Sequence, residues 1–299
     1  MSILVVGSMA LDTIKTPAGE APEIIGGSAT HFALGARFFT GVRLMSTVGK
    51  DFPERYLDEL TKRGIDVSGV HRADGRTFRW TGSYEGDMNA AKTLSVSLNV
   101  MGTYVPRVPA AFKNSPYVFL ANIGPEVQEA VLRQVSRPKL VVCDTMNLWI
   151  ATKLPALKRL LKQVDILVLN DGEARMLSRE RNLVAAARDL LRLGPKAVIV
   201  KKGEHGLLLA HGKTIFPLPA YPLAKVTDPT GAGDSFGGGF TGWLAETGSL
   251  SSKNLRMAAA YGTVVASFTV EDFGTRRIEA ISRKDVVRRF NAFRNLVDF

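Results

Sequence analysis

Short apolar runs alternate along this chain with longer segments in which apolar residues return every three or four positions. The runs predict buried strands at residues 3–6, 42–48, 117–121, 140–143, 166–169 and 197–200. The periodic segments predict helices at residues 30–39, 52–63, 126–134, 154–163, 173–177 and 183–191. Strands that alternate with helices in this way are typical of a mostly parallel sheet with helices on both faces. We therefore expect an α/β fold.

Two regions depart from that alternation. Residues 77–105 are strand-like, with Trp80, Tyr84 and Val96 among their apolar side chains, and contain no segment of helical length. They predict antiparallel strands outside the main sheet, with either a functional or a purely structural task. Residues 206–210 and 214–218 flank His211-Gly212-Lys213 and predict a hairpin. We expect residues 1–299 to form one domain.

Composition changes this picture little, except for charge. The chain has 299 residues, 45% of them hydrophobic, which is enough for a full α/β core, and a formal net charge of +11. A basic protein can bind nucleic acid. However, the densest basic run, residues 276–294, reads as the solvated face of a terminal helix, and no nucleic-acid-binding motif is present. We predict Val286, Val287, Phe290, Phe293 and Leu296 on the apolar side of that helix and no nucleic-acid partner.

The location of the protein is predicted from three further observations. Cys143 is the one cysteine and lies in an apolar run, so we expect a buried thiol in a reducing compartment. The first apolar run is too short for a signal peptide and no basic segment precedes it. No apolar run approaches membrane-spanning length. We therefore expect a cytoplasmic protein with no membrane partner.

The segment from Asp228 to Asp234 carries the clearest chemistry. Pro229 cannot donate a backbone hydrogen bond, so a strand over residues 223–227 should end there and a helix should follow. Gly231, Ala232 and Gly233 would let an anion approach the free amides of that helix start. Asp234 follows on the first turn, and a carboxylate beside an anion site suits phosphoryl transfer to a hydroxyl. Close packing of elements is the alternative explanation for such glycines.

This segment closely resembles the C-terminal signature of the PfkB/ribokinase family of carbohydrate kinases, and the resemblance extends over nearly the whole chain. It implies a ribokinase-like fold in which residues 77–105 form a small β lid over the sugar, and it implies ATP and Mg²⁺ as cofactors. Asp234 would be the catalytic base, and Gly231, Ala232 and Gly233 the anion hole. Asp228 would order the loop or lie near a monovalent cation such as K⁺.

The same resemblance assigns residues to the acceptor site. Asp12 is similar to the family's sugar-contacting acid, and Gly26-Gly27 to the glycine pair that meets sugar hydroxyls. His31 stands where the family usually has Asn, so the pattern of hydroxyls that is read there differs. Asn122 follows a predicted strand and is a further candidate for substrate binding.

Other matching residues are assigned to the nucleotide. Asn170 and Glu173 resemble the family's N-x-x-E motif, so Glu173 would support Mg²⁺, through water. Lys201, Gly203 and Gly206 match its nucleotide-phosphate contacts, although other members often carry a hydroxyl residue in place of Lys201. We also expect two glycine- and alanine-rich helices to pack closely, with adenine beside them. That places two more residues in the nucleotide site, Ala258 and Gly262.

The expected function is an ATP-dependent kinase that phosphorylates a hydroxymethyl group of a sugar or sugar-like substrate. Two alternatives stay open. A nucleoside kinase of the same family would share these motifs, and an aromatic sandwich from Phe32, Trp80 or Tyr84 would favour it. A nucleic-acid or regulatory binding protein could keep the fold without the activity. An edge of the lid could also pair two subunits into a homodimer.

Overall fold

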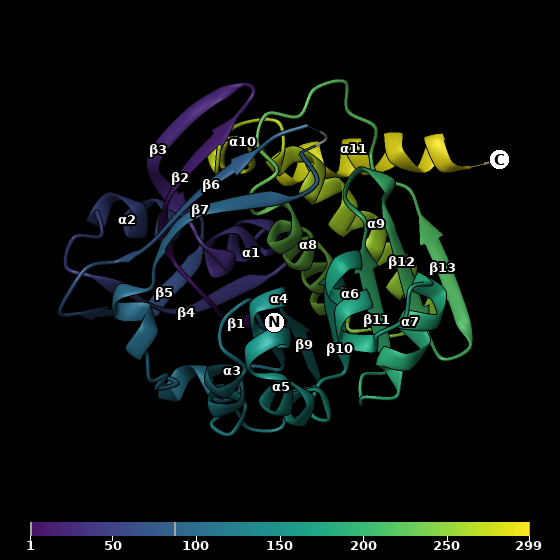
Figure 1. Cartoon of the computed structure of the whole chain (residues 1–299), viewed down its shortest axis with the longest axis horizontal. Coiled ribbons are helices and arrows are strands. Elements are labelled where there is room, and N and C mark those ends of the chain that lie inside the picture. The colour runs from purple at the N-terminus through teal and green to yellow at the C-terminus, as the bar shows by residue number, and fades with distance from the viewer. Residues whose placement is uncertain (1, 87, 299) are drawn as a thin grey trace.

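Figure 1 shows the computed structural model of the chain, which describes residues 2–86 and 88–298. Within these residues a large sheet has nine strands. Their spatial order is β13 (Thr214–Leu218), β12 (Leu207–His211), β11 (Ala197–Lys201), β10 (Ile166–Asn170), β9 (Leu140–Asp144), β8 (Tyr117–Leu120), β1 (Ser2–Val6), β4 (Gly41–Gly49) and β5 (Ile65–Ala73). All neighbours from β5 to β11 are parallel, and β12 and β13 are antiparallel. The predicted α/β fold with a mostly parallel sheet is therefore confirmed.

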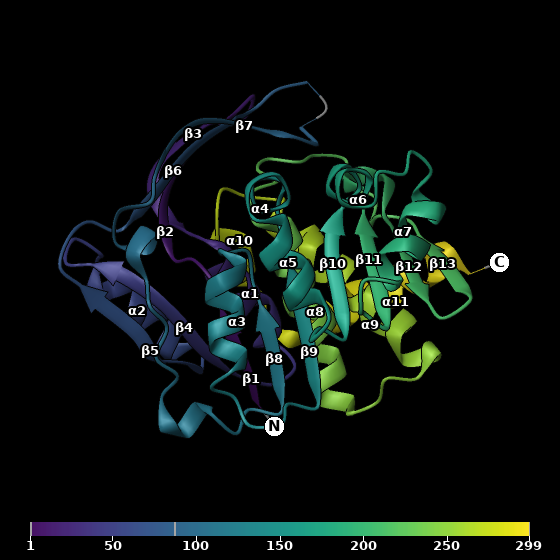
Figure 2. The same ribbon diagram turned by 60° about the horizontal axis from the view of Figure 1, so that its bottom comes forward.

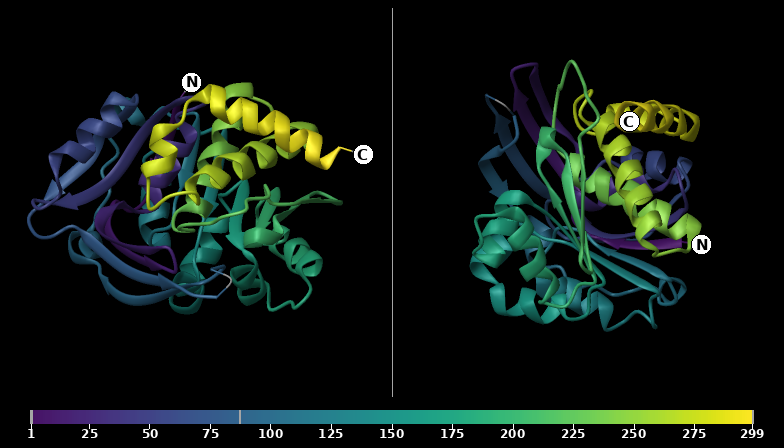
Figure 3. Two further views of the ribbon diagram at one scale, coloured as in Figure 1. Left: turned by 90° about the horizontal axis from the view of Figure 1, so that it is seen from above. Right: turned by 90° about the vertical axis from the view of Figure 1, so that its right-hand side faces the viewer.

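Helices cover both faces of this sheet, as Figures 2 and 3 show. The strands send alternate residues to opposite cores, so that Ile3 and Val5 face one side and Leu4 and Val6 the other. One side packs against α1 (Ser28–Ala36), α2 (Glu54–Lys62), α8 (Ala232–Thr247), α9 (Ser252–Thr269), α10 (Arg276–Ala280) and α11 (Arg283–Val297). The other side packs against α3 (Pro125–Leu132), α4 (Asn147–Thr152), α5 (Leu154–Leu161), α6 (Asp171–Ser178) and α7 (Leu183–Leu191). Such burial on both faces explains why the strands read as continuous apolar runs.

A second, four-stranded sheet stands at one end of the large sheet and curves over it in Figure 2. We call it the small sheet; its order is β3 (Gly19–Gly26), β2 (Ala10–Thr16), β6 (Phe78–Tyr84) and β7 (Ala91–Ser97). Strands β6 and β7 confirm the antiparallel pair expected at residues 77–105. The strands end earlier than residue 105, because β7 ends at Ser97 and Val100 lies in the 3₁₀ helix η1 (Asn99–Thr103). Further 3₁₀ turns are η2 (Ala110–Phe112) and η3 (Gly203–His205).

Several sequence predictions of elements were wrong. The sequence indicated no strands at β2, β3 or β5; all three carry exposed charges among their apolar residues, and β3 and β5 also carry glycines. Residues 223–227 form no strand; they run in a proline-interrupted loop tied to the body by a bond from Thr227 N to Val270 O. On α11, Val286, Phe290 and Phe293 are buried as predicted, but Leu296 is 60% exposed.

Glycines allow α8 to lie against two other helices at once. A Cβ at Gly238 would stand 2.3 Å from the backbone oxygen of Phe32 in α1, and one at Gly239 would stand 3.1 Å from the Cα of Gly262 in α9. The close approach of α8 and α9 that the sequence suggested is thus confirmed. It places the first turn of α8 beside the carboxyl ends of the parallel strands, where open α/β sheets bind ligands.

Candidate active site

The first turn of α8 supplies an acid and two open amides. Gly231 is its N-cap with φ 74°, a conformation that favours glycine, and Asp234 lies in the first turn, half-buried and accessible to solvent. In the described chain the N–H groups of Gly231 and Gly233 meet no carbonyl, whereas the N–H of Ala232 donates to the oxygen of Pro229 at 3.2 Å. The expected anion hole therefore loses one of its three amides, because the turn that leads into the helix uses it.

Four charged groups gather around this helix start. The ammonium of Lys201, at the end of β11, lies where a Cβ on Gly233 would be only 2.7 Å away. It donates to Oδ2 of Asp144, at the end of β9, over 3.2 Å. Asp144, Glu173 and Asp234 together raise the pKa of Lys201 above its ordinary value, although burial lowers it. The lysine is therefore a fixed positive charge above the start of α8.

The acids of this cluster are held at high pKa. Burial, followed by the charge of Asp144, raises the pKa of both Glu173 and Asp234 to about 7, and the ammonium of Lys201 opposes the rise. Burial likewise raises the pKa of Asp144, against the pull of Lys201. Three acids thus share one cation, and such a site favours a further positive charge.

The residues fit a magnesium ion that keeps most of its water. Asn170 and Glu173 form a capping box at the start of α6, in which each side chain accepts the other's backbone N–H at 2.8 Å. This box fixes the Glu173 carboxylate near the cluster. No group of three or more His, Cys, Asp or Glu in the described residues is arranged to hold a metal by itself. A shell completed by water and phosphate oxygens is what Mg²⁺ usually has.

Asp12 and the glycine pair form the acceptor side. Asp12 lies on β2 and is buried, and its carboxylate is so close to Gly26 that a Cβ there would stand 1.9 Å from Oδ2. The backbone of Gly27 donates to the carboxylate, while Oδ1 has no partner in the described chain. Burial raises the pKa of Asp12 to about 7, with smaller contributions from the charges of Asp228 and Asp234. Asp12 thus faces the same space as the α8 acid.

His31 closes the space between α1 and α8. Its ring covers Gly231, since a Cβ on that glycine would stand 2.3 Å from two ring atoms, Cγ and Nδ1. The side chain is 1% exposed, and neither ring nitrogen has a partner in the described residues. Burial lowers the pKa of His31 to about 4, so the ring is neutral at physiological pH. A neutral imidazole offers one donor and one acceptor to a ligand.

Two other candidates already have partners. Asn122, just beyond β8, accepts from Trp149 Nε1 at 2.8 Å and directs its amide at the sulfur of Met146. Asp228 is fully buried and accepts from the N–H groups of Thr230 and Gly274, each at 2.8 Å. Asp228 therefore orders the loop before α8, as the sequence suggested.

A cavity of about 640 Å³ opens beside the α8 start. Of the residues assigned to the nucleotide or the anion hole, it is lined by Asn170, Lys201, Gly203, Gly206, Ala232 and Gly233. Ala258 and Gly262 do not line it, because both are buried in helix packing and Gly262 faces Phe236. The cavity is lined instead by residues nearer the C-terminus of α9, Thr263, Ala266 and Ser267, and by Val270 just after it.

The sequence matches a known protein family over most of its length. Residues 2–281 match the model of the pfkB family carbohydrate kinases. The chain belongs to the pfkB family of carbohydrate kinases. It is therefore a phosphotransferase that acts on a hydroxyl group.

Relatives in this family carry several substrate names. A cytidine kinase of Thermococcus kodakarensis is 28% identical over 245 residues, covering 80% of this chain and 87% of that protein. A ribokinase of Bacillus subtilis is 26% identical over 297 residues, covering 92% and 94%. The structure of the Methanocaldococcus jannaschii nucleoside kinase matches with a TM-score of 0.75 and 25% identity, covering 97% and 98%.

Sequence reasoning missed three parts of this pfkB family site. Asp144 is the part that the sequence could have indicated. It directly follows a predicted strand, and its strand ends at the same sheet edge as those of Asn170 and Lys201. The loop that walls the cavity contains Tyr221, Pro222, Leu223 and Val226, and the sequence pattern predicts a strand over part of it. Tyr84 was considered only as an aromatic, but its hydroxyl lies 3.2 Å from that of Thr230 before α8.

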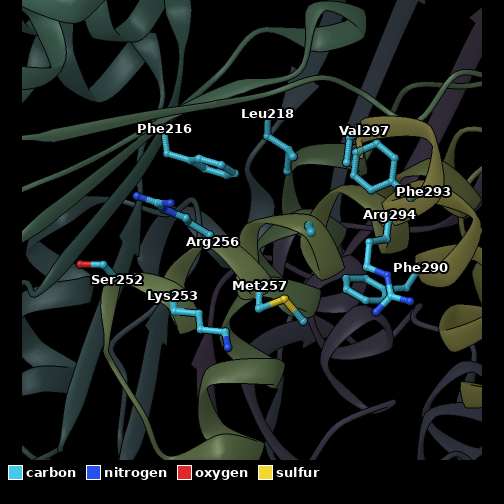
Figure 4. A pocket seen from close by; sticks show the side chains of 11 residues that line it. Phe216, Leu218, Ser252, Lys253, Arg256, Met257, Phe290, Phe293, Arg294 and Val297 are labelled. Carbon is cyan, nitrogen blue, oxygen red and sulfur yellow. The ribbon is translucent and has the colours of Figure 1, made fainter. Parts of the chain in front are cut away.

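The pfkB fold here also has a second, mostly apolar cavity of about 420 Å³, away from these acids (Figure 4). It lies between β13, α9 and α11, and its lining includes Phe216, Met257 and Phe293. Lys253, Arg256 and Arg294 are its charged lining residues. Nothing in this cavity resembles phosphoryl-transfer chemistry. Among the described residues, no helix is both long and apolar enough to span a membrane.

Proposed function

We propose that this protein transfers the γ-phosphoryl group of ATP to a hydroxymethyl group of a sugar or sugar-like substrate. One observation carries the proposal. Asp234 stands in the first turn of α8 between open amides, a lysine ammonium and the acceptor-side acid Asp12. An acid at a helix start that also binds anions suits the proton transfer and the charge that phosphoryl transfer requires.

The residues divide into two roles. Asp234 orients the acceptor hydroxyl and takes its proton, while the amides of Gly231 and Gly233 receive the charge of the transferring group. Lys201 neutralises the nucleotide phosphates at the mouth of the cavity, and Asp144 holds its ammonium in place. Glu173 would hold Mg²⁺ through water, and the ion would supply charge neutralisation when bound. On the acceptor side, Asp12, Gly26, Gly27 and His31 bind hydroxyls, and Asn122 supports the wall.

The working protein is proposed to be a single domain in the cytoplasm, with the small sheet as a lid. By excluding water the lid would prevent loss of the phosphoryl group to hydrolysis. Strand β7 is an exposed edge with Leu94 48% and Val96 55% exposed, and a second copy could pair with it to give a homodimer. Asp228 would place backbone oxygens of its loop for a monovalent cation such as K⁺. A nucleoside kinase is the second candidate, favoured by the names of the cytidine kinase and nucleoside kinase relatives.

The proposed function is tested by replacing Asp234, the proposed catalytic base. Asp234→Asn should lower kcat by roughly a hundredfold to ten thousandfold, because general bases contribute that much, and should leave ATP affinity nearly unchanged. Product formation from sugars, sugar phosphates and nucleosides is measured with ATP and Mg²⁺, and ATP affinity by calorimetry. The exposed Asp58→Asn on α2 is the matched control. The proposal fails if no compound is phosphorylated, or if Asp234→Asn keeps the rate of the parent protein.

A further inference from the structure

The inner face of the small sheet carries an acid and an indole side by side. In the parallel pair of β2 and β6, Asp12 is in register with Trp80. In the antiparallel pair of β6 and β7, Trp80 is in register with Val96. Residues in register on neighbouring strands project from the same face. Asp12, Trp80 and Val96 therefore form one row across that face.

This face looks toward the active site. Tyr84 projects from the same face as Trp80, four positions further along β6, and its hydroxyl lies 3.2 Å from the Thr230 hydroxyl in the loop before α8. The charge of Asp12 is also felt by Tyr84. The row thus begins at the acceptor-side acid and runs out over the entrance of the site.

The indole of Trp80 is held in a fixed position on the sheet. Its benzene half covers Gly82, where a Cβ would stand 2.0 Å from Cη2 and 2.2 Å from Cζ2. Its Nε1 donates to the hydroxyl of Thr93 on β7 at 3.1 Å. A glycine beneath the ring and a bonded ring nitrogen leave the indole few other positions. Such an aromatic group is a prearranged stacking platform.

The row continues as apolar surface that a bare sugar would not use. Trp80 is only half-buried, and Val96 is 55% exposed. Neighbouring strands are about 5 Å apart, so Trp80 is about one furanose ring away from the acid and Val96 one strand further. A ligand that fits this row has hydroxyls at one end and a flat apolar group at the other.

We propose that the acceptor is a nucleoside, whose base stacks on Trp80 while Asp12 binds the ribose hydroxyls. This inference rests on the proposed kinase function and narrows its substrate class. Stacking on one aromatic face does not depend on hydrogen-bond readout, so several bases should be accepted.

Binding is tested without catalysis by tryptophan fluorescence. The chain has three tryptophans, of which Trp149 donates to Asn122 and Trp243 is stacked on Tyr261. Adding cytidine, uridine, adenosine or inosine should quench the parent protein by stacking on Trp80, and adding ribose should not. Trp80→Phe should remove this quenching while it still binds nucleosides.

Catalysis supplies the second arm of the experiment. The parent protein should phosphorylate at least one nucleoside with a kcat/KM more than a hundredfold above that for ribose. Trp80→Leu should raise the nucleoside KM by roughly tenfold to a hundredfold with little change in kcat, as expected for lost base stacking. Gly82→Ala should act in the same direction by displacing the indole. Thr81→Ala, on the opposite face of β6, is the control and should leave the KM unchanged.

The two proposals fail in different ways. If ribose and nucleosides are used equally well, or if Trp80→Leu leaves the nucleoside KM unchanged, the nucleoside inference is overturned and the kinase function stands. If neither class gives a phosphorylated product, the kinase function itself fails. Quenching by ribose as strong as that by nucleosides would also overturn the role of Trp80.

Discussion

Carboxylates with raised pKa values are the main feature of this protein at the scale of single residues. Asp12, Glu173 and Asp234 all have pKa values raised to about 7, with burial as the largest cause. A carboxylate that is costly to ionise in the folded protein destabilises it wherever that group is charged. These three acids therefore lower the folding stability of the protein at the pH values where they are charged.

Asp12→Asn should stabilise the protein in a pH-dependent way. The pKa of Asp12 is 3.8 ordinarily and about 7 in the folded chain. The folded state thus binds more protons than the unfolded state between these values, and its stability falls as pH rises from about 4 to about 7. At pH 8 Asp12 is charged and buried, so Asp12→Asn should raise the thermal midpoint; at pH 5, only about one unit above the ordinary pKa, the rise should be clearly smaller. Calorimetry at both pH values checks this, and an equal change at both would contradict it.

Residue chemistry was predictable where a motif is local and was missed where partners are distant in sequence. Gly231 and Asp234 lie within one turn of chain, and their roles at the α8 start were accessible from spacing alone. The hydrogen bond from the Ala232 N–H to the Pro229 oxygen is equally local, but the sequence did not predict it, because it depends on the geometry of the turn. Asp144 meets Lys201 across 57 positions of sequence, and only the order of strands in the sheet brings them together.

At the scale of elements, the glycine content of helix α8 is explained by its close packing against two neighbouring helices. Interior glycines cost about 1 kcal/mol each relative to alanine in an exposed helix. In α8 they are kept because α1 and α9 approach from two sides, through Gly238 and Gly239 respectively. The close packing fixes the direction of the helix and thus the position of its first turn.

Gly238→Ala should destabilise the protein despite its better helix propensity. The new Cβ would stand 2.3 Å from the oxygen of Phe32 and 2.8 Å from the nitrogen of Ala36, both backbone atoms that cannot move alone. Overpacking of this kind costs about 1–3 kcal/mol, which lowers the thermal midpoint by roughly 2–5 °C in a chain of this size. Gly172→Ala, exposed in α6, is the control: its new Cβ meets no backbone atom of another element, so it should gain helix propensity and should not lower the midpoint. A Gly238→Ala midpoint equal to that of the parent would refute the packing argument.

The sequence predicts best those elements whose residues are all buried to a similar degree. The parallel strands β9, β10 and β11 of the large sheet are buried on both faces, and the sequence predicts them within one residue. Strands β2 and β3 face a neighbouring sheet, solvent and the active site in turn, so their polar and apolar residues give no regular period. Leu223 and Val226 are apolar because they wall a cavity, which a sequence pattern does not distinguish from a strand.

At the scale of the whole molecule, the small sheet bridges the two halves of the active site. Its β6–β7 turn reaches η3 beside the nucleotide-side cavity, where Asn89 donates to Glu204 Oε1 at 3.0 Å and accepts from the Glu204 N–H at 3.3 Å. Both Asn89 and Gly203 line that cavity. At its other end the same sheet carries Asp12. With the proposed assignment of these residues, acceptor and nucleotide would therefore contact one connected element.

Asn89→Ala should uncouple ATP use from transfer. Without the two bonds to Glu204 the small sheet closes less tightly, so water reaches the phosphoryl group more often. Each such bond contributes about 1 kcal/mol, so the ratio of ATP hydrolysed to acceptor phosphorylated should rise roughly tenfold, and the acceptor KM should rise with it. Parallel assays of ADP and phosphorylated product measure this ratio.

Ser95→Ala on β7 is the control, and Asn89→Asp should act more strongly, because its charge repels that of Glu204. An unchanged ratio in both Asn89 variants would mean that the contact joins two surfaces without governing closure.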